Sequence, residues 1–141
     1  MTEPTVWTFF YGSFINLEVL KQGGFVPARH EVAKLNGFDI HIRPLATLVR
    51  SDRQCVYGIV ASGTHEQLRR LYSQDWVGTY LPEPVLVETP DGKWRSAFCY
   101  IAPVSESRPA TTDYIDRIVG PARQYGFPPW YLARLESFRP E

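Results

Sequence analysis

The chain has 141 residues, a length that suits one domain spanning residues 1–141. Hydrophobic residues make up 44% and aromatic residues 14% of the sequence, so the chain can bury a core and is neither disordered nor fibrous. Fifteen Lys and Arg balance fifteen Asp and Glu, so no field of one sign attracts nucleic acid or an anionic membrane. Because long apolar runs and a signal-peptide pattern are also missing, we expect a cytoplasmic protein without nucleic acid or membrane as a partner.

The first half of the chain predicts a strand, a helix, two strands and a second helix. Val6–Tyr11 is β-branched and aromatic and ends at Gly-Ser, which predicts a strand followed by a tight loop. Leu17–Gln22 predicts a short helix capped by the preceding Asn. His30–Ile42 alternates polar and apolar residues around a glycine, which predicts one bulged strand or two short strands. Val56–Ala61 predicts a buried strand, and Thr64–Ser73 predicts an amphipathic helix.

The second half predicts a hairpin and then two helices. Val85–Glu88 and Trp94–Ile101 are expected to pair as antiparallel strands through the Pro-Asp-Gly turn at residues 90–92. Thr111–Tyr125 has a helical period, although an internal proline would kink or divide the helix. A final short helix starts at the Pro-Pro pair and runs to Leu135. Clustered strands with flanking helices, without regular βαβ alternation, predict an α+β fold with a small, strongly curved or closed sheet.

The loop after the first strand, residues 11–16, is a candidate ligand site. It ends a strand and opens a helix, so the backbone amides of residues 12 to 16 are in a position to converge on an anion such as a carboxylate. The nucleotide-binding glycine motifs do not occur here, and Ser13 is not part of a GxSxG nucleophile motif. An ordinary turn with a helix cap is the alternative.

Asp75 is the candidate general base. It follows a predicted helix in a segment with Trp76, Val77 and Tyr80, and partial desolvation by these side chains would raise the pKa of its carboxyl group. A raised pKa suits a carboxylate that accepts a proton near neutrality. The alternative is a loop Asp that is hydrogen-bonded to backbone amides. Glu83, between two prolines, is a second carboxylate in reach or an exposed loop residue.

The cysteines and histidines predict no reactive or metal site. Cys55 and Cys99 belong to no CxxC pair and have aromatic or β-branched neighbours, so both are expected to be buried core thiols. His30, His41 and His65 form no HxxxH or HExxH motif and are expected to be structural or surface residues. No metal and no cofactor is therefore predicted.

Five segments of the chain occur in a specific order. They are Phe9–Ser13 (FFYGS), Leu35–Phe38 (LNGF), Val56–Val60 (VYGIV), the turn 90–92 with Ala97–Ile101, and Gly120–Tyr131 (GPARQYGFPPWY). In this order they resemble the motifs of the γ-glutamylcyclotransferase family. The resemblance covers nearly the whole chain and implies a small, closed or strongly curved mixed β-barrel with flanking helices.

The resemblance also implies an activity. It implies a γ-glutamyl cyclotransferase that releases 5-oxoproline from a γ-glutamyl amine, a γ-glutamyl amino acid or a γ-glutamyl-protected intermediate. The α-amine of such a substrate attacks its own γ-carbonyl, so the reaction needs no covalent nucleophile, metal or redox cofactor. The implied partner is a small-molecule γ-glutamyl substrate.

The implied site departs from the family at two positions. Asp75 stands where the family has its catalytic Glu, and Trp76 stands where the family has Gly. The residues implied to bind the substrate are Tyr11, Gly12, Ser13, Phe14, Ile15 and Tyr80. Because Asp is one methylene shorter and Trp adds bulk, two alternatives stay open: another amide or acyl enzyme on the same pocket, and a catalytically silent member that binds a small molecule or a protein.

Overall fold

A computed structural model describes residues 4–74, 80–102 and 108–140 of the chain. The strands are β1 (Thr5–Phe10), β2 (His30–Ile42), β3 (Ala46–Thr64), β4 (Leu81–Glu88) and β5 (Trp94–Ile101). The helices are the 3-10 helix η1 (Ser13–Ile15) and the α-helices α1 (Leu17–Gln22), α2 (His65–Tyr72), α3 (Thr112–Gln124) and α4 (Pro129–Glu136). Elements therefore follow one another in the predicted order.

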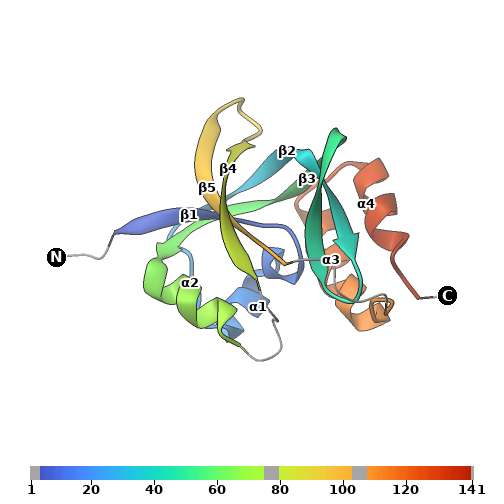
Figure 1. Ribbon diagram of the computed structural model, residues 1–141, viewed down its shortest axis with the longest axis horizontal. Helices are drawn as coiled ribbons and strands as arrows, with labels where there is room; N and C mark the ends of the chain where they lie inside the picture. The colour runs from blue at the N-terminus through green and yellow to red at the C-terminus, as the bar shows by residue number, and fades with distance from the viewer. Residues whose placement is uncertain (1–3, 75–79, 103–107, 141) are drawn as a thin grey trace.

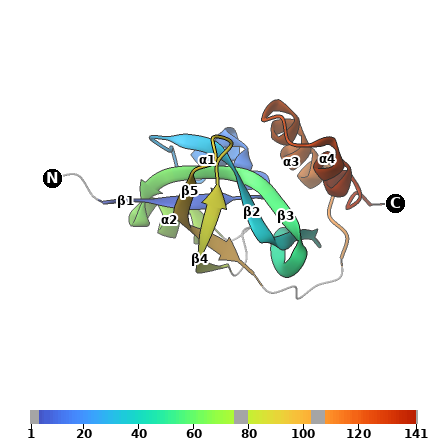
Figure 2. The same ribbon diagram turned by 90° about the horizontal axis from the view of Figure 1, so that it is seen from above.

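The strands form a closed barrel in the order β1-β3-β2-β4-β5 (Figure 1). Neighbouring strands are antiparallel except β1 and β5, whose parallel pairing closes the ring. Figure 2 shows α1 and α2 beside β1, and α3 and α4 together at the other end of the barrel. The predicted α+β class with a closed mixed β-barrel is confirmed.

The long hairpin of β2 and β3 is larger than the sequence predicted. β2 is a single strand whose register with β3 shifts between Asn36 and Phe38, around Gly37 at φ +89°. β3 begins at Ala46 rather than at Val56, because residues 46–50 pair with the second half of β2. The largely exposed polar stretch 51–54 interrupts the apolar pattern of β3. The sequence therefore predicted no strand over the first half of β3.

β4 is also longer than predicted. It begins at Leu81 rather than at Val85, and its two prolines, Pro82 and Pro84, pair in register with Tyr100 and Phe98 of β5. β4 is paired with β2 only at Glu88, so one side of its proline stretch is open as in an edge strand, where prolines are tolerated because the missing donor faces the unpaired side. A proline-rich stretch can therefore be a strand here although its sequence is typical of a loop.

The helix caps follow the predicted chemistry. The Thr64 hydroxyl accepts the Gln67 N–H at 3.1 Å, and the Gln67 side chain accepts the Thr64 N–H at 2.8 Å, which is a complete capping box for α2. Thr111 caps α3 in the same way by accepting the Tyr114 N–H. Pro121 lies inside a continuous α3 and does not divide it. No helix in the described parts of the chain is both long and apolar enough to span a membrane.

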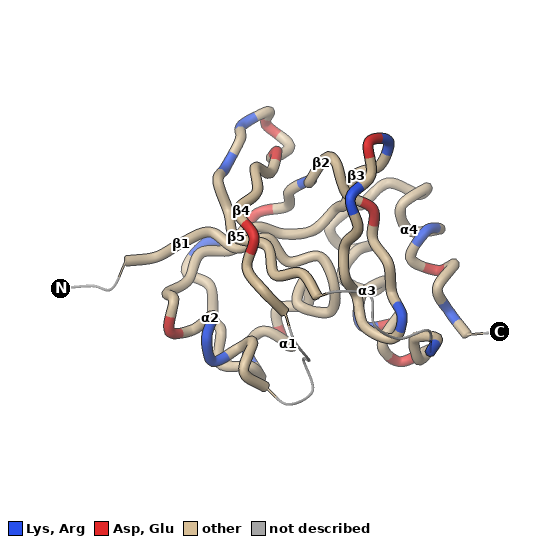
Figure 3. Tube along the Cα trace, viewed as in Figure 1, with Lys and Arg blue, Asp and Glu red and all other residues tan. Residues whose placement is uncertain are grey.

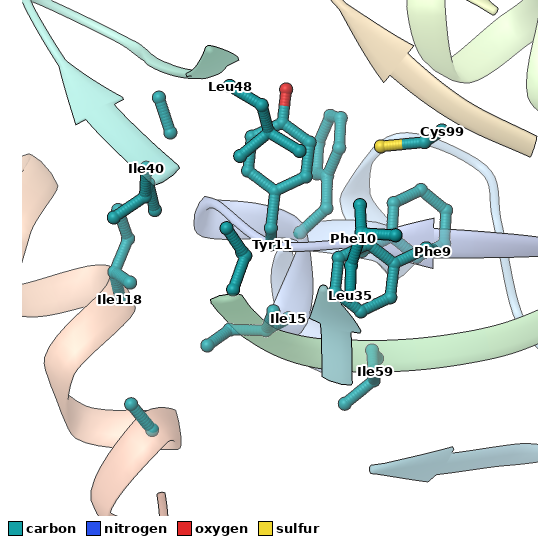
Figure 4. Packing of buried hydrophobic residues seen from close by; sticks show 14 of the residues in the cluster. Phe9, Phe10, Tyr11, Ile15, Leu35, Ile40, Leu48, Ile59, Cys99 and Ile118 are labelled. Atoms are coloured by element: carbon teal, nitrogen blue, oxygen red, sulfur yellow. The ribbon is translucent and has the colours of Figure 1, made fainter. Parts of the chain in front are cut away.

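Strand β1 runs through the middle of the core (Figure 4). Its consecutive residues Phe9 and Phe10 are both fully buried, so both faces of the strand are covered. The ring of Phe10 makes edge contacts with Phe14 and Phe25, at centroid distances of 5.8 and 5.5 Å. This packing fixes the end of β1, where the candidate loop begins.

The two cysteines differ in their surroundings. Cys99 is fully buried, as predicted, and burial raises the pKa of its thiol. Cys55 is only half-buried, so the prediction of a second core thiol is wrong. It is paired with Asn36 next to the register shift between β2 and β3.

Gly58 sets the distance between β1 and β3. A Cβ atom built on it would lie 2.0 Å from the carbonyl oxygen of Phe10 and 2.9 Å from the ring of Phe9. We expect Gly58→Ala to lower the free energy of unfolding by roughly the 1–3 kcal/mol typical of overpacking, or more because the contact is with backbone. Denaturant unfolding followed by tryptophan fluorescence measures the loss.

Gly120→Ala is the matched control for Gly58→Ala. Gly120 is exposed within α3, and a Cβ there meets nothing within 4 Å. Alanine is the better helix former, so this variant should gain about 0.5–1 kcal/mol. Equal stability of the two variants would show that the close approach at Gly58 does not constrain the barrel.

Candidate functional site

The candidate loop is a single tight turn between β1 and α1. The Ile15 amide donates to the Gly12 carbonyl and the Asn16 amide donates to the Ser13 carbonyl, both at 3.1 Å. The Asn16 side chain then caps α1 by accepting the Glu18 N–H at 3.0 Å. The predicted convergence of all five amides of residues 12–16 on an anion is therefore wrong for Ile15 and Asn16, because the turn itself uses their N–H groups.

A small pocket with a cavity volume of about 40 Å³, partly open to solvent, lies against this loop. The residues lining it are Phe10, Tyr11, Gly12, Ser13, Phe14, Leu45, Ala46, Tyr72, Tyr80 and Tyr114. None of these side chains carries a charge. Its walls, as far as the structure describes them, therefore offer aromatic faces, hydroxyl groups and backbone polar groups to a ligand.

Five of the six residues predicted to bind substrate line this pocket, namely Tyr11, Gly12, Ser13, Phe14 and Tyr80. The sixth, Ile15, does not: it is fully buried, and its carbonyl accepts the Tyr125 hydroxyl at 2.9 Å. Ile15 thus anchors the loop to the end of α3 and presents no group to the pocket.

Three tyrosine hydroxyls hold the pocket wall together. The Tyr80 hydroxyl donates to the Ala46 carbonyl at 2.5 Å, and the Ala46 N–H donates to the Tyr114 oxygen at 3.0 Å. The Tyr11 hydroxyl donates to the Tyr100 carbonyl at 2.7 Å. Segments from β1, the start of β3, the approach to β4, the end of β5 and α3 are joined in this way.

Tyr72 forms the aromatic side of the pocket. Its ring stacks on Tyr100 with a centroid distance of 3.9 Å and an angle of 10° between the rings. It also contacts the edge of Phe14 at 5.6 Å and the ring of Tyr80 at 5.9 Å. Stacked rings have few rotamers to lose, so this wall is well suited to hold a shape before a ligand arrives.

Burial keeps the pocket hydroxyl groups neutral. It is the main cause that raises the pKa of Tyr11, Tyr72, Tyr80 and Tyr114 above the usual value for tyrosine. A phenol in this state donates a hydrogen bond at any physiological pH. A hydroxyl among them whose hydrogen is not already donated inside the protein, as those of Tyr11 and Tyr80 are, can thus donate to an oxygen atom of a ligand.

Gly12 allows the loop to lie directly on β3. A Cβ atom on Gly12 would be 2.8 Å from the Cβ of Ala46 and 3.4 Å from the Tyr114 hydroxyl oxygen. The first distance is shorter than real Cβ contacts, so only glycine fits without a shift. The need for glycine at this position is thus steric, since its φ of −101° is open to other residues.

The predicted carboxylates fall into two groups. Asp75, with Trp76, lies outside the described residues. Glu83 is described, and it forms an ion pair with Arg50 at 2.5 Å in a groove between β2 and β4. Glu83 does not line the pocket, so the prediction that it is a second carboxylate in reach of the site is wrong. Its partner Arg50 holds it on another face of the barrel.

Within the described residues, no charged side chain lines the pocket. Figure 3 shows acidic and basic residues interleaved on α2, on α4 and at the tips of the hairpins. His41 packs against Phe138 and His65 against Phe98. In the described ranges, no three His, Cys, Asp or Glu side chains come together in a way that could hold a metal ion.

Sequence reasoning missed two of the pocket tyrosines. Tyr72 lies within the predicted helix Thr64–Ser73 and Tyr114 within the predicted helix Thr111–Tyr125, and neither was predicted to line a site. Both stand at helix ends, where a tyrosine can bury its ring and still present its hydroxyl to a neighbouring loop. The position of a tyrosine at a helix end was the available sign that it could line a site. Only the folded structure shows which loop lies beside it.

No family model matches the sequence, and no curated protein matches it. Solved structures do match. One described as a gamma-glutamyl cyclotransferase is 24% identical with a TM-score of 0.83, and the alignment covers 98% of this chain and 90% of that one. An uncharacterized protein from Homo sapiens is 25% identical with a TM-score of 0.83, over 99% of this chain and 90% of that one.

A more distant match is a gamma-glutamyl cyclotransferase specific to glutathione from yeast. It is 14% identical with a TM-score of 0.69, and the alignment covers 96% of this chain and 97% of that one. All three alignments span the barrel and the helices that flank the pocket. The chain therefore has the γ-glutamylcyclotransferase-like fold, and the family resemblance of its sequence motifs is confirmed at the level of the fold.

Proposed function

We propose that the chain is a γ-glutamyl cyclotransferase that releases 5-oxoproline from a γ-glutamyl amine, a γ-glutamyl amino acid or a γ-glutamyl-protected intermediate, with Asp75 as the general base. The observation that carries the proposal is the pocket at the end of β1. Tyr72 and Tyr80 both line it, and Asp75 is the single carboxylate in the sequence between them. Solved structures of the same fold described as gamma-glutamyl cyclotransferases support the reaction class.

The reaction balances without any added reactant. A base removes a proton from the α-ammonium group, and the free amine attacks the γ-carbonyl carbon of the same molecule. A carbon–nitrogen bond forms and the carbonyl oxygen becomes negative. The attacking nitrogen then loses a second proton, the carbonyl re-forms, and the bond to the leaving amine breaks as that amine takes up the two protons that the attacking nitrogen has released. The protein has to fold the substrate back on itself, accept a proton and donate hydrogen bonds to the developing oxyanion.

The described part of the pocket suits two of these tasks. The aromatic wall of Tyr72 and Tyr80 limits the space for an extended substrate and favours a folded one. Neutral hydroxyl groups and the Gly12–Ser13 backbone supply donors to oxygen. The remaining task, proton acceptance, requires a carboxylate or another base, and none of the lining side chains is one. Asp75 fills that role in this proposal.

We expect purified protein, treated with a chelator and without nucleotide, to release 5-oxoproline from at least one member of a panel of γ-glutamyl amines and γ-glutamyl amino acids. Intramolecular attack uses only groups of the substrate and the protein. Chromatography of the product against authentic 5-oxoproline is the measurement. No product across a broad panel, or activity that disappears with the chelator, would remove this proposal.

Asp75→Asn tests the base. The amide keeps the size of the side chain but accepts no proton, so turnover should fall by roughly 10²- to 10⁴-fold while KM changes little. Glu83→Gln is the matched control, because Glu83 pairs with Arg50 away from the pocket, and it should keep normal turnover. Full activity in Asp75→Asn would assign the proton to another group.

Asp75→Glu separates two forms of the same proposal. If the pocket works with a shortened base, the extra methylene restores reach and turnover is retained or rises. If the pocket is built around Asp, the longer side chain overpacks it and turnover falls. Steady-state kinetics on the best substrate of the panel distinguish the two results.

Gly12→Ala tests whether ligands meet the loop. The new methyl group displaces either Ala46 or the loop, so we expect the affinity for 5-oxoproline to fall by at least roughly tenfold, the equivalent of about 1.4 kcal/mol. Titration calorimetry measures the affinity, and Gly120→Ala serves as the control. A folded Gly12→Ala protein with normal affinity would mean that the loop is only a turn.

A further inference from the structure

The hydroxyl of Tyr114 occupies the pocket beside the loop. The side chain comes from the first turn of α3, where the Tyr114 N–H is bound by the Thr111 hydroxyl at 3.1 Å. Its oxygen accepts the Ala46 N–H at 3.0 Å and lies 3.4 Å from the position of a Cβ on Gly12. Helix α3 therefore delivers one polar atom to the place where the loop and β3 meet.

The hydrogen atoms of the pocket hydroxyls can be followed one by one. Tyr11 donates its hydrogen to the Tyr100 carbonyl, and Tyr80 donates its hydrogen to the Ala46 carbonyl. Both hydrogens are thereby used inside the protein. Tyr114 differs, because its oxygen is an acceptor in its contact with Ala46 and so keeps its own hydrogen to donate.

Ser13 is the neighbour of this hydroxyl. Both Ser13 and Tyr114 line the pocket. Unlike the hydroxyls of Tyr11 and Tyr80, the Tyr114 hydroxyl does not donate to a backbone carbonyl of the described residues. An oxygen atom of a ligand in the pocket can therefore accept its hydrogen.

We propose that Tyr114 is a catalytic residue of the cyclotransferase reaction, an inference that rests on the proposed function. Its hydroxyl, held by the Ala46 N–H and exposed to the pocket, donates a hydrogen bond to the γ-carbonyl oxygen of the substrate. That oxygen becomes negative when the amine attacks, so the bond is stronger in the transition state than in the ground state. A donor used in this way raises kcat more than it lowers KM.

The position of Tyr114 explains why a neutral donor is effective here. The contact with Ala46 and the capped first turn of α3 fix the hydroxyl before the substrate arrives, so little reorganisation is needed during the reaction. Burial raises the pKa of its hydroxyl and keeps the hydrogen in place at neutral pH. In a pocket wall without charged side chains, a single well-placed donor has few competitors for the oxyanion.

Tyr114→Phe removes the hydroxyl, and Tyr125→Phe is its matched control. Tyr125 lies at the other end of α3, and its hydroxyl supports the same loop through the Ile15 carbonyl at 2.9 Å without lining the pocket. We expect Tyr114→Phe to lower kcat by roughly the 10²- to 10³-fold that follows loss of one oxyanion donor, with KM nearly unchanged. Tyr125→Phe should change kcat by less than about threefold, although both variants lose stability.

The kinetic results distinguish a failure of the role of Tyr114 from a failure of the proposed cyclotransferase function. Wild-type turnover together with normal kcat in Tyr114→Phe overturns the role of Tyr114 and leaves the cyclotransferase proposal intact. A similar loss of kcat in both variants overturns it as well, because support of the loop then explains the effect. A wild-type protein without activity on the panel overturns both proposals together.

Infrared spectroscopy of wild-type protein gives a readout that does not depend on a folded variant. The amide carbonyl of 5-oxoproline, labelled with ¹³C, derives from the γ-carbonyl of the substrate. A donor in the pocket should hold its stretching frequency below the value in a solvent that donates no hydrogen bonds, and the difference should shrink in Tyr114→Phe but persist in Tyr125→Phe. A bound carbonyl frequency in wild-type protein equal to that in such a solvent overturns the assignment of a donor.

Discussion

The backbone of Ala46 is the point on which the pocket depends. Its N–H is bound by Tyr114 of α3 and its carbonyl by Tyr80 before β4, while its Cβ lies where only a glycine at position 12 fits. Four segments that are far apart in the sequence therefore meet at one residue. Shifting this residue would move two tyrosines and the loop together, so the pocket behaves as one unit.

The barrel holds this meeting point in place. β1 is buried on both faces, and its close approach to β3 at Gly58 leaves no room for it to slide. The loop that follows β1 is then pulled toward Ala46 on one side and anchored through Ile15 and Tyr125 on the other. Because the loop is short, the buried strand before it fixes the positions of the binding groups on the loop. A small barrel can position a site in this way without a large second domain.

The parts of this structure that could be predicted are those fixed by local chemistry. Turn residues and strong alternation predicted β5, the hairpin and α1, and the Asn before α1 predicted its cap. The first half of β3 could not be predicted because exposed polar residues interrupt its apolar pattern, and the start of β4 could not because its prolines are typical of a loop. The contact of Tyr114 was missed for another reason: its ring follows the helical pattern, but its hydroxyl meets Ala46 only once β3 lies beside α3.

The neutral walls of the pocket constrain any chemistry carried out there. Tyr11, Tyr72, Tyr80 and Tyr114 keep their protons across the neutral range because burial raises the pKa of each hydroxyl. They can therefore donate hydrogen bonds, but they cannot serve as the base at that pH. For the proposed reaction, a change of rate between about pH 5 and 9 then has to come from the carboxylate that accepts the proton and from the ammonium group that loses it. The carboxylate must be ionised before it can accept the ammonium proton, so the rate of the proposed reaction rises as the pH rises through the pKa of that carboxyl group.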